Sequence, residues 1–176
     1  MKEVHRLLST AFFIIPAILA IDIFWKLNTV TEYWLLATSI ITSIYFWWGY
    51  VFIGEKIHHS QKLIEFVFDI FIFFMIITLF TTIALSSITS WLYIYLFLFF
   101  LSIVKYLSIK PNVTNTKIKR FITKKLKTDT LAFVFILIVI FFAISYDYEL
   151  YAVIALFLME LLHILYVSFI DKIYEI

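Results

Sequence analysis

Two ionisable residues stand three positions apart within the last apolar stretch of the chain. Glu160 and His163 lie in residues 149–170, which otherwise hold mostly aliphatic and aromatic side chains. A charged group at mid-depth in a membrane costs roughly 2.5–3.5 kcal/mol on insertion scales, so such residues face protein or water rather than lipid. Glu160 is expected near the midplane, about 15 Å from the outer end at about 1.5 Å per residue. Carboxyl and imidazole groups at this depth are typical of a proton or cation path.

Three other acidic residues extend this pattern. Glu149 precedes Glu160 by 11 residues, close to three helical turns, so the two share one face of a helix. Asp69 lies about 9 Å in from the inner end of its own apolar run, at a depth similar to that of His163. A contact of Asp69 with His163 or Glu160 is expected if their helices are neighbours. Asp22, near the outer end of the first apolar run, is expected to extend the series outward.

The same residues also admit a structural interpretation, in which buried hydrogen bonds hold the helices together and no ion moves. Other chemistries lack the residues that they need. The chain has no Cys and only 2 Gly, so thiolate metal sites and glycine-rich phosphate loops are excluded. A haem or di-metal centre needs several histidines at one depth, and His163 alone lies within an apolar run. No nucleophile–base motif indicates an enzyme, and no metal or cofactor is expected.

An unusually apolar chain must position these residues. Of 176 residues, 64% are hydrophobic, 21% aromatic and only 15% charged. A soluble domain of this size cannot bury so much apolar surface, because a large part of its chain must face water. The sequence therefore predicts an all-α integral membrane protein. Its richness in Ile, Phe, Lys and Tyr suggests an AT-rich prokaryotic genome.

Six apolar runs predict one domain built as a bundle of six transmembrane helices. Each run is long enough, or nearly so, to cross a hydrocarbon core of roughly 30 Å. Pro16 is expected to kink the first helix. Thr38, Thr42, Tyr45 and Gly49 share one face of the second, which favours close packing against another helix over the lining of a pore. The expected spans are residues 7–25, 33–53, 63–85, 91–109, 130–146 and 149–170.

The one long connection, residues 110–128, is strongly basic. Eight of the chain's 14 Lys and Arg lie between positions 105 and 127. Ile118, Phe121, Ile122 and Leu126 repeat at helical spacing, which predicts a basic amphipathic helix at the membrane interface between the fourth and fifth spans. Lys105 is expected to reach the headgroups from the end of the fourth span. The residues expected to bind anionic lipid headgroups or a soluble acidic partner, but no nucleic acid, are Lys117, Lys119, Arg120, Lys124, Lys125 and Lys127.

The basic residues also predict the orientation. With six crossings, both termini and the connections 54–62 and 110–128 share one side of the membrane. That side carries 13 of the 14 Lys and Arg, and the opposite side carries only Lys26. By the positive-inside rule, the protein is expected in the cell membrane with both termini in the cytoplasm.

Two functions agree with this pattern. The first is a small channel-like or permeation protein for protons or cations. It is expected as a homo-oligomer, because six short helices with little glycine leave no room for a wide internal pore. The second is a non-conducting anchor or effector subunit whose basic segment binds a soluble partner protein or anionic lipid, for example in a prokaryotic stress or defence system. Enzymatic activity is not expected.

Overall fold

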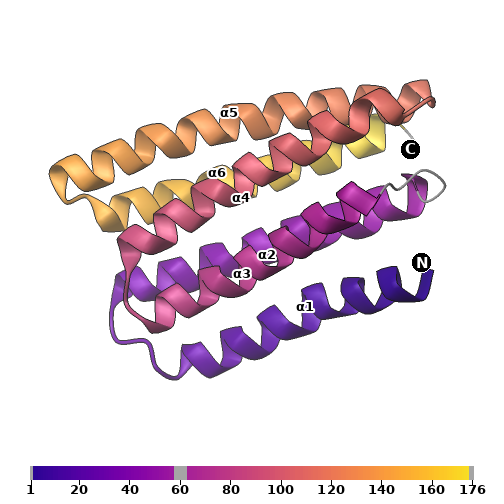
Figure 1. Cartoon of the computed structure of the whole chain (residues 1–176). Coiled ribbons are helices and arrows are strands. Elements are labelled where there is room, and N and C mark those ends of the chain that lie inside the picture. Colours follow the sequence, from indigo (N-terminus) through magenta and orange to yellow (C-terminus); the bar gives the residue numbers. More distant parts are fainter. Residues whose placement is uncertain (1, 58–62, 175–176) are drawn as a thin grey trace.

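The computed structural model describes the backbone of residues 2–57 and 63–174, and side chains within 7–51 and 66–166. Over these residues the chain is helical, without strands (Figure 1). The elements are α1 (Lys2–Phe24), α2 (Val30–Ile57), α3 (Leu63–Ala84), α4 (Ile88–Ile109), the short 3-10 turn η1 (Lys110–Asn112), α5 (Thr116–Tyr146) and α6 (Glu149–Tyr174).

The prediction of an all-α chain with six long helices is confirmed. Within the described residues, α1, α3, α4, α5 and α6 are long and apolar enough to cross a membrane. The remaining helix, α2, has side chains described only as far as Val51, and it carries a row of buried hydroxyl residues, Thr38, Ser39, Thr42 and Ser43. The membrane location and the cytoplasmic side of the termini remain predictions. The basic residues near both termini and in the predicted connection 54–62 lie outside the described side chains.

The six helices form an elongated bundle in which chain neighbours run antiparallel (Figure 1). Helix α2 packs against α1, α3 and α6, while α4 packs against α3 and α5, and α5 packs against α6. The first turn of α1, the last turn of α6 and the start of α5 lie at the same end of the bundle. This end corresponds to the side predicted to face the cytoplasm, and the opposite end is called the outer end below.

The separate interfacial helix predicted for residues 110–128 is wrong, because α5 is continuous from Thr116 to Tyr146. Asn115 caps its start by accepting hydrogen bonds from the backbone N–H of Lys117 and Ile118, at 2.9 and 3.3 Å. No Gly or Pro follows to break the helix before Asp147, which ends it in the left-handed conformation. The basic segment is thus the first part of a helix about 46 Å long, at about 1.5 Å per residue.

A hydrogen-bonded clasp holds the outer end of the bundle together. Glu32, just before the predicted span 33–53, accepts hydrogen bonds from the backbone N–H of Asn28 and Thr29 at 2.8 and 3.0 Å. The Thr29 hydroxyl in turn accepts from the N–H of Glu32, which completes a capping box at the start of α2. Ser86, in the turn between α3 and α4, donates to the same carboxylate at 2.9 Å. The N–H of Asn28 is the main cause that lowers the pKa of Glu32.

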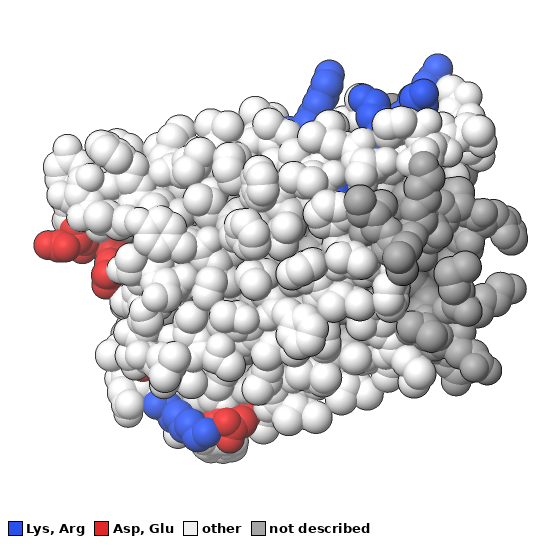
Figure 2. Space-filling view, viewed as in Figure 1, with Lys and Arg blue, Asp and Glu red and all other residues white. Residues whose placement is uncertain are grey.

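The interior is packed with aromatic side chains, and the outside is apolar where lipid is expected. Phe12, Phe80, Trp91 and Phe99 are among the largest fully buried side chains. Helix α1 continues through Pro16, which is also buried. Figure 2 shows a largely uncharged surface across the middle of the bundle, with acidic side chains towards the outer end, where the exposed Lys26–Asp22 pair also lies, and the other basic side chains towards the opposite end. This pattern is what a membrane-spanning bundle requires.

Candidate functional site

Five polar side chains meet where α2, α4, α5 and α6 come together, and they are called the Asp129 cluster below. Each is at most 6% exposed. They come from four helices, which shows that the bundle rather than any single helix assembles the site. The members are Tyr45 on α2, Ser102 on α4, Lys125 and Asp129 on α5, and His163 on α6.

The carboxylate of Asp129 is the centre of this cluster. Its Oδ1 accepts a hydrogen bond from the Tyr45 hydroxyl at 2.8 Å, and its Oδ2 accepts from the Ser102 hydroxyl at 2.6 Å. The ammonium of Lys125 lies 3.2 and 3.4 Å from the two oxygens. His163 Nε2 lies 3.1 Å from Oδ1. Four groups on four helices therefore compensate one buried negative charge, as a buried carboxylate requires.

Lys125 belongs to the interior, so its predicted place among the lipid-binding cations is wrong. It precedes Asp129 by four residues on α5, which places both side chains on one face of the helix. Its ammonium also donates to the Tyr45 hydroxyl. The same nitrogen lies 4.1 Å from the centre of the Tyr45 ring and 4.9 Å from that of Tyr106, so aromatic faces complete its surroundings.

The hydrogen bonds fix how His163 can carry protons. Its Nε2 lies 3.2 Å from the Tyr45 hydroxyl oxygen. Because the hydroxyl proton of Tyr45 is donated to Asp129, Nε2 can act only as a donor, and it holds a proton in either charge state of the ring. The other ring nitrogen, Nδ1, is buried and has no hydrogen-bond partner within the described part of the chain. Nδ1 is therefore the ring nitrogen that can accept a further hydrogen bond or a proton.

Glu160 lies one helical turn from His163 and is fully buried. Its Oε2 accepts a hydrogen bond from the Tyr95 hydroxyl at 3.2 Å, and the Tyr95 ring stacks on Trp91 with ring centres 5.0 Å apart. Trp91 in turn donates to the Ser39 hydroxyl at 2.9 Å, which ties α4 to α2. Among the described residues, nothing bonds the second carboxyl oxygen, Oε1. The predicted burial of Glu160 and His163 is confirmed.

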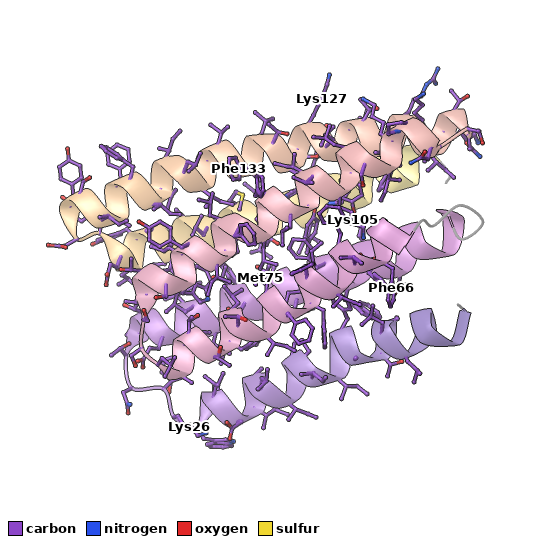
Figure 3. All side chains as sticks on the ribbon, in the orientation of Figure 1. Lys26, Phe66, Met75, Lys105, Lys127 and Phe133 are labelled. Atoms are coloured by element: carbon purple, nitrogen blue, oxygen red, sulfur yellow. The ribbon has the colours of Figure 1, made fainter. Side chains whose placement is uncertain are left out.

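A second buried ion pair joins α3 to α4. Lys105 donates to Oδ1 of Asp69, and the two side chains are only 7% and 3% exposed. The expected contacts of Asp69 with His163 or Glu160 are therefore wrong, as is the expected reach of Lys105 to the headgroups. Figure 3 shows the difference in direction, with Lys105 inside the bundle and Lys127 pointing outward from α5.

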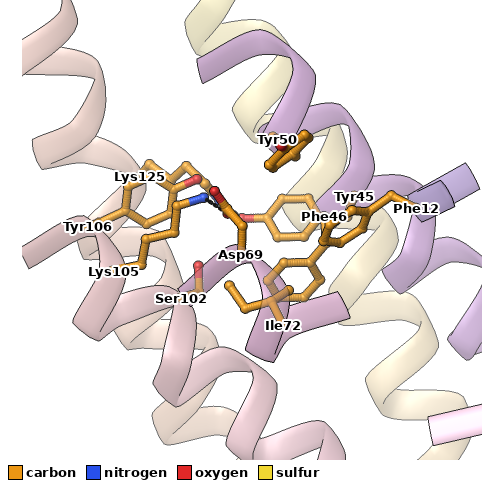
Figure 4. Close-up of a pocket in the computed structure, with 11 residues that line it drawn as sticks. Phe12, Tyr45, Phe46, Tyr50, Asp69, Ile72, Ser102, Lys105, Tyr106 and Lys125 are labelled. Carbon is orange, nitrogen blue, oxygen red and sulfur yellow. Dashed lines mark hydrogen bonds and ion pairs between the residues drawn. The ribbon is translucent and has the colours of Figure 1, made fainter. Parts of the chain in front are cut away.

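A small cavity lies between the two ion pairs (Figure 4). Its lining includes Lys125 and Ser102 of the Asp129 cluster together with Asp69, Lys105 and Tyr50. Its volume of about 10 Å³ is close to the minimum that holds one water molecule. The Asp69–Lys105 pair and the Asp129 cluster therefore border the same cavity, which is too small to form a pore.

Two predicted site residues lie elsewhere. Asp22 forms an exposed ion pair with Lys26 at 2.6 Å, with side chains 61% and 62% exposed, and takes no part in the buried site. Glu149 is half-buried in the first turn of α6, at the outer end of the bundle. Glu149 thus lies at the outer end of α6 as expected, and the buried part of the polar face consists of Glu160 and His163 within the described side chains.

Five of the six basic residues predicted to bind lipid or a partner do lie on the outside of α5. Lys117, Lys119, Arg120 and Lys127 are exposed and Lys124 is half-buried. The structure thus separates these cations from Lys125. In the part of the chain that the structure describes, no group of three His, Cys, Asp or Glu could hold a metal ion.

Sequence reasoning missed Asp129 and Tyr45 as members of the site. Asp129 lies between the expected basic segment 110–128 and the expected span 130–146. A signal was present, because Phe121, Ile122, Lys125, Asp129 and Ala132 follow one another at spacings of one, three or four residues along one helical face. A lysine and an aspartate in register with an apolar face indicate a buried pair.

Comparison of the chain with protein-family models, curated proteins and solved structures found no match. The residues of the site and their geometry therefore carry the functional proposal below.

Proposed function

We propose that the protein passes protons across the cell membrane through side chains in the interior of the bundle, with both termini in the cytoplasm. The observation that carries the proposal is the pair of buried, unbonded atoms on neighbouring turns of α6, Oε1 of Glu160 and Nδ1 of His163, within the described residues. A carboxyl and an imidazole in this position can exchange a proton, and ionisable groups at mid-depth mark proton relays in membrane proteins.

The exchange conserves charge inside the bundle. When protonated Glu160 gives its proton to neutral His163, a carboxylate and an imidazolium form side by side. The carboxylate keeps the hydrogen bond from Tyr95, and the imidazolium keeps the contact of Nε2 with Asp129 at 3.1 Å. Asp129 and Lys125 balance one another throughout, so the only charges that change in this step are those of Glu160 and His163, and their sum stays the same.

The rest of the path leads towards the cytoplasmic end. The Tyr45 hydroxyl contacts both His163 and Asp129, and Lys125 borders the cavity that reaches Asp69. A single water molecule in this cavity would join the Asp129 cluster to the Asp69–Lys105 pair. Protons can follow such a chain of hydrogen bonds, because each group both gives and receives a proton in turn.

The size of the cavity favours protons over other cations as the transported species. At about 10 Å³ it takes about one water molecule and no hydrated ion. A pore between copies of the chain would instead be lined by the exposed faces of the helices, and beyond Lys127 the exposed face of α5 is apolar, with Leu131, Phe141 and Phe142 among the exposed side chains. The proposed path therefore needs only one copy of the chain, whether or not the protein forms a homo-oligomer.

Proton flux into liposomes that contain the purified protein tests this proposal. A pH-sensitive dye reports the flux under an imposed potential for the wild type, Glu160→Gln and the control Glu149→Gln. Gln keeps the shape of Glu and can accept the Tyr95 hydrogen bond, but it cannot release a proton. Because a positioned acid–base group contributes about 10²–10⁴-fold, we expect Glu160→Gln to lose about 100-fold or more of the flux.

Glu149→Gln makes the same chemical change at the outer end of α6 and is expected to keep wild-type flux. Thermal unfolding and gel filtration check that each variant is folded and assembled. Wild-type flux in a folded Glu160→Gln variant, or no flux from the wild type at several pH values and potentials, contradicts the proposal. In the second case the non-conducting anchor becomes the working function.

A further inference from the structure

We propose that the exposed face of α5 is a binding site for one anionic phospholipid of the cytoplasmic leaflet. The site is separate from the buried proton path, because it lies on the outside of α5 and Lys125 and Asp129 lie on the inside. Its phosphate is held by a basic groove, and its acyl chains follow the apolar continuation of the same helical face.

The basic part of the site is a shallow groove of about 430 Å³ on the first three turns of α5. Its lining residues follow one another at alternating spacings of three and one, so they form a single stripe on one side of the helix. They include four cations and two hydroxyl residues but no acidic residue. The lining consists of Thr116, Lys119, Arg120, Thr123, Lys124 and Lys127.

Three of the charges in this groove are available to a ligand. Lys119, Arg120 and Lys127 are exposed, and none of the ion pairs between described residues includes them. Arg120 can hold a phosphate with two parallel hydrogen bonds, while lysines contribute compact charges around it. The groove therefore complements a phosphate group with negative charge.

The face that carries these cations turns apolar within one helical turn. Leu131 follows Lys127 by four residues and is 70% exposed, and Val134, Phe135 and Ile138 continue the stripe with exposed side chains. From Lys127 to Phe142 this apolar part extends about 22 Å, at about 1.5 Å per residue. It is longer than one leaflet of a hydrocarbon core, which is about 15 Å, or half of about 30 Å.

This change from basic to apolar selects a phospholipid over a soluble anion. A phospholipid carries a negative phosphate at one end and acyl chains that extend into the membrane from it, and the face of α5 offers both parts in the same order. A soluble phosphate compound would use the groove alone. The predicted orientation also places the groove at the cytoplasmic leaflet, where anionic lipids attract basic segments.

Native mass spectrometry of the full-length protein tests the site, with phosphatidylglycerol and phosphatidylcholine titrated in parallel. The groove variant combines Lys119→Gln, Arg120→Gln and Lys127→Gln. The matched control combines Lys26→Gln, Lys110→Gln and Lys117→Gln, which removes the same charge from residues that do not line the groove. Each cation contributes about 1 kcal/mol near an anionic surface, so the groove variant is expected to bind phosphatidylglycerol about 100-fold more weakly.

The proposal expects the control to keep most of its affinity and phosphatidylcholine to bind weakly to every variant. It also expects long-chain phosphatidylglycerol to bind more tightly than a short-chain form, and glycerol phosphate to displace neither at comparable concentration. Equal losses in the groove and control variants would show a diffuse charge effect and overturn the site. Displacement by glycerol phosphate would show that the apolar face takes no part, and would overturn the lipid as its ligand.

Discussion

The basic residues between positions 105 and 127 divide into two groups with opposite surroundings. The side chains of Lys105 and Lys125 are at most 7% exposed and form ion pairs inside the bundle. Lys119 and Lys127, on the same stretch of chain, are exposed and line a groove without acidic residues. The difference is decided by the presence of an aspartate within reach, because a lysine enters an apolar interior only where its charge is compensated.

The two buried lysines differ in where their paired aspartates lie along the chain. Asp129 follows Lys125 by one turn of α5, so the helix alone brings the two together. Asp69 reaches Lys105 from α3, so that pair forms only when α3 and α4 pack. Substitutions of the buried lysines should therefore change the stability of the bundle. Substitutions of the exposed lysines should change the binding of ligands at its surface.

The largest effect is expected for Asp129→Ala. The change leaves the ammonium of Lys125 buried without its counter-ion and removes the acceptor of Tyr45 and Ser102. Breaking a buried pair in this way costs about 3–5 kcal/mol of unfolding free energy. Denaturant unfolding of the purified protein measures the loss. A destabilisation below about 1 kcal/mol would show that the cluster is far more hydrated than the structure indicates.

Lys105→Met should come next, with a loss of about 3 kcal/mol, at the lower end of the range for broken buried pairs. Met keeps the apolar length of lysine, so the loss reflects the uncompensated carboxylate of Asp69. Adding Asp69→Leu to this variant should restore most of the stability, because two apolar side chains then fill the site. The same unfolding assay checks both variants, and failure of the second change to rescue the first would argue against a direct pair.

A smaller effect, of about 1 kcal/mol, is expected for Glu32→Gln at the outer clasp. Hydrogen bonds from Asn28 and Ser86 lower the pKa of Glu32 below its ordinary value of about 4.5. A carboxyl with a lowered pKa in the folded state stabilises the fold above its ordinary pKa, and this stability is lost as the pH falls through the lower folded value. Melting temperatures measured from neutral to acidic pH should therefore fall less steeply for Glu32→Gln than for the wild type.

The smallest effect is expected for Asp22→Ala, below about 0.5 kcal/mol. Its pair with Lys26 is more than half exposed on both sides, and exposed pairs one turn apart contribute little. The same unfolding assay serves as the check. A loss as large as that of Lys105→Met would remove the distinction between buried and exposed pairs in this protein.

The sequence was sufficient to predict the helices and the burial of the α6 residues. Glu160 and His163 stand alone in an apolar run, so they had to face the interior. The continuity of α5 was missed because its first three turns are rich in lysine. The residues between these turns and the apolar part include no Gly or Pro, and the hydroxyls of Thr128 and Thr130 bond to the carbonyls of Lys124 and Leu126 within the same helix.

The partners across helices could not be predicted from the sequence. Asp69 was expected to meet α6, but its actual partner is on α4, because α3 packs against α4 and α6 packs against α2 and α5. Periodicity reports which face of a helix is buried and leaves open which helix covers it. The choice between Lys105 and His163 as the partner of Asp69 depends on that neighbour.

The most direct test of proton transfer through the interior uses Lys125→Met combined with Asp129→Leu. Replacing a buried ion pair with apolar residues of similar volume is often neutral or stabilising by about 1–4 kcal/mol, so this double variant should remain folded. It removes the anchor of His163 and the link to the Asp69 cavity. Proton flux into liposomes should therefore be lost in the folded double variant beside an active wild type, whereas wild-type flux in that variant would contradict the account.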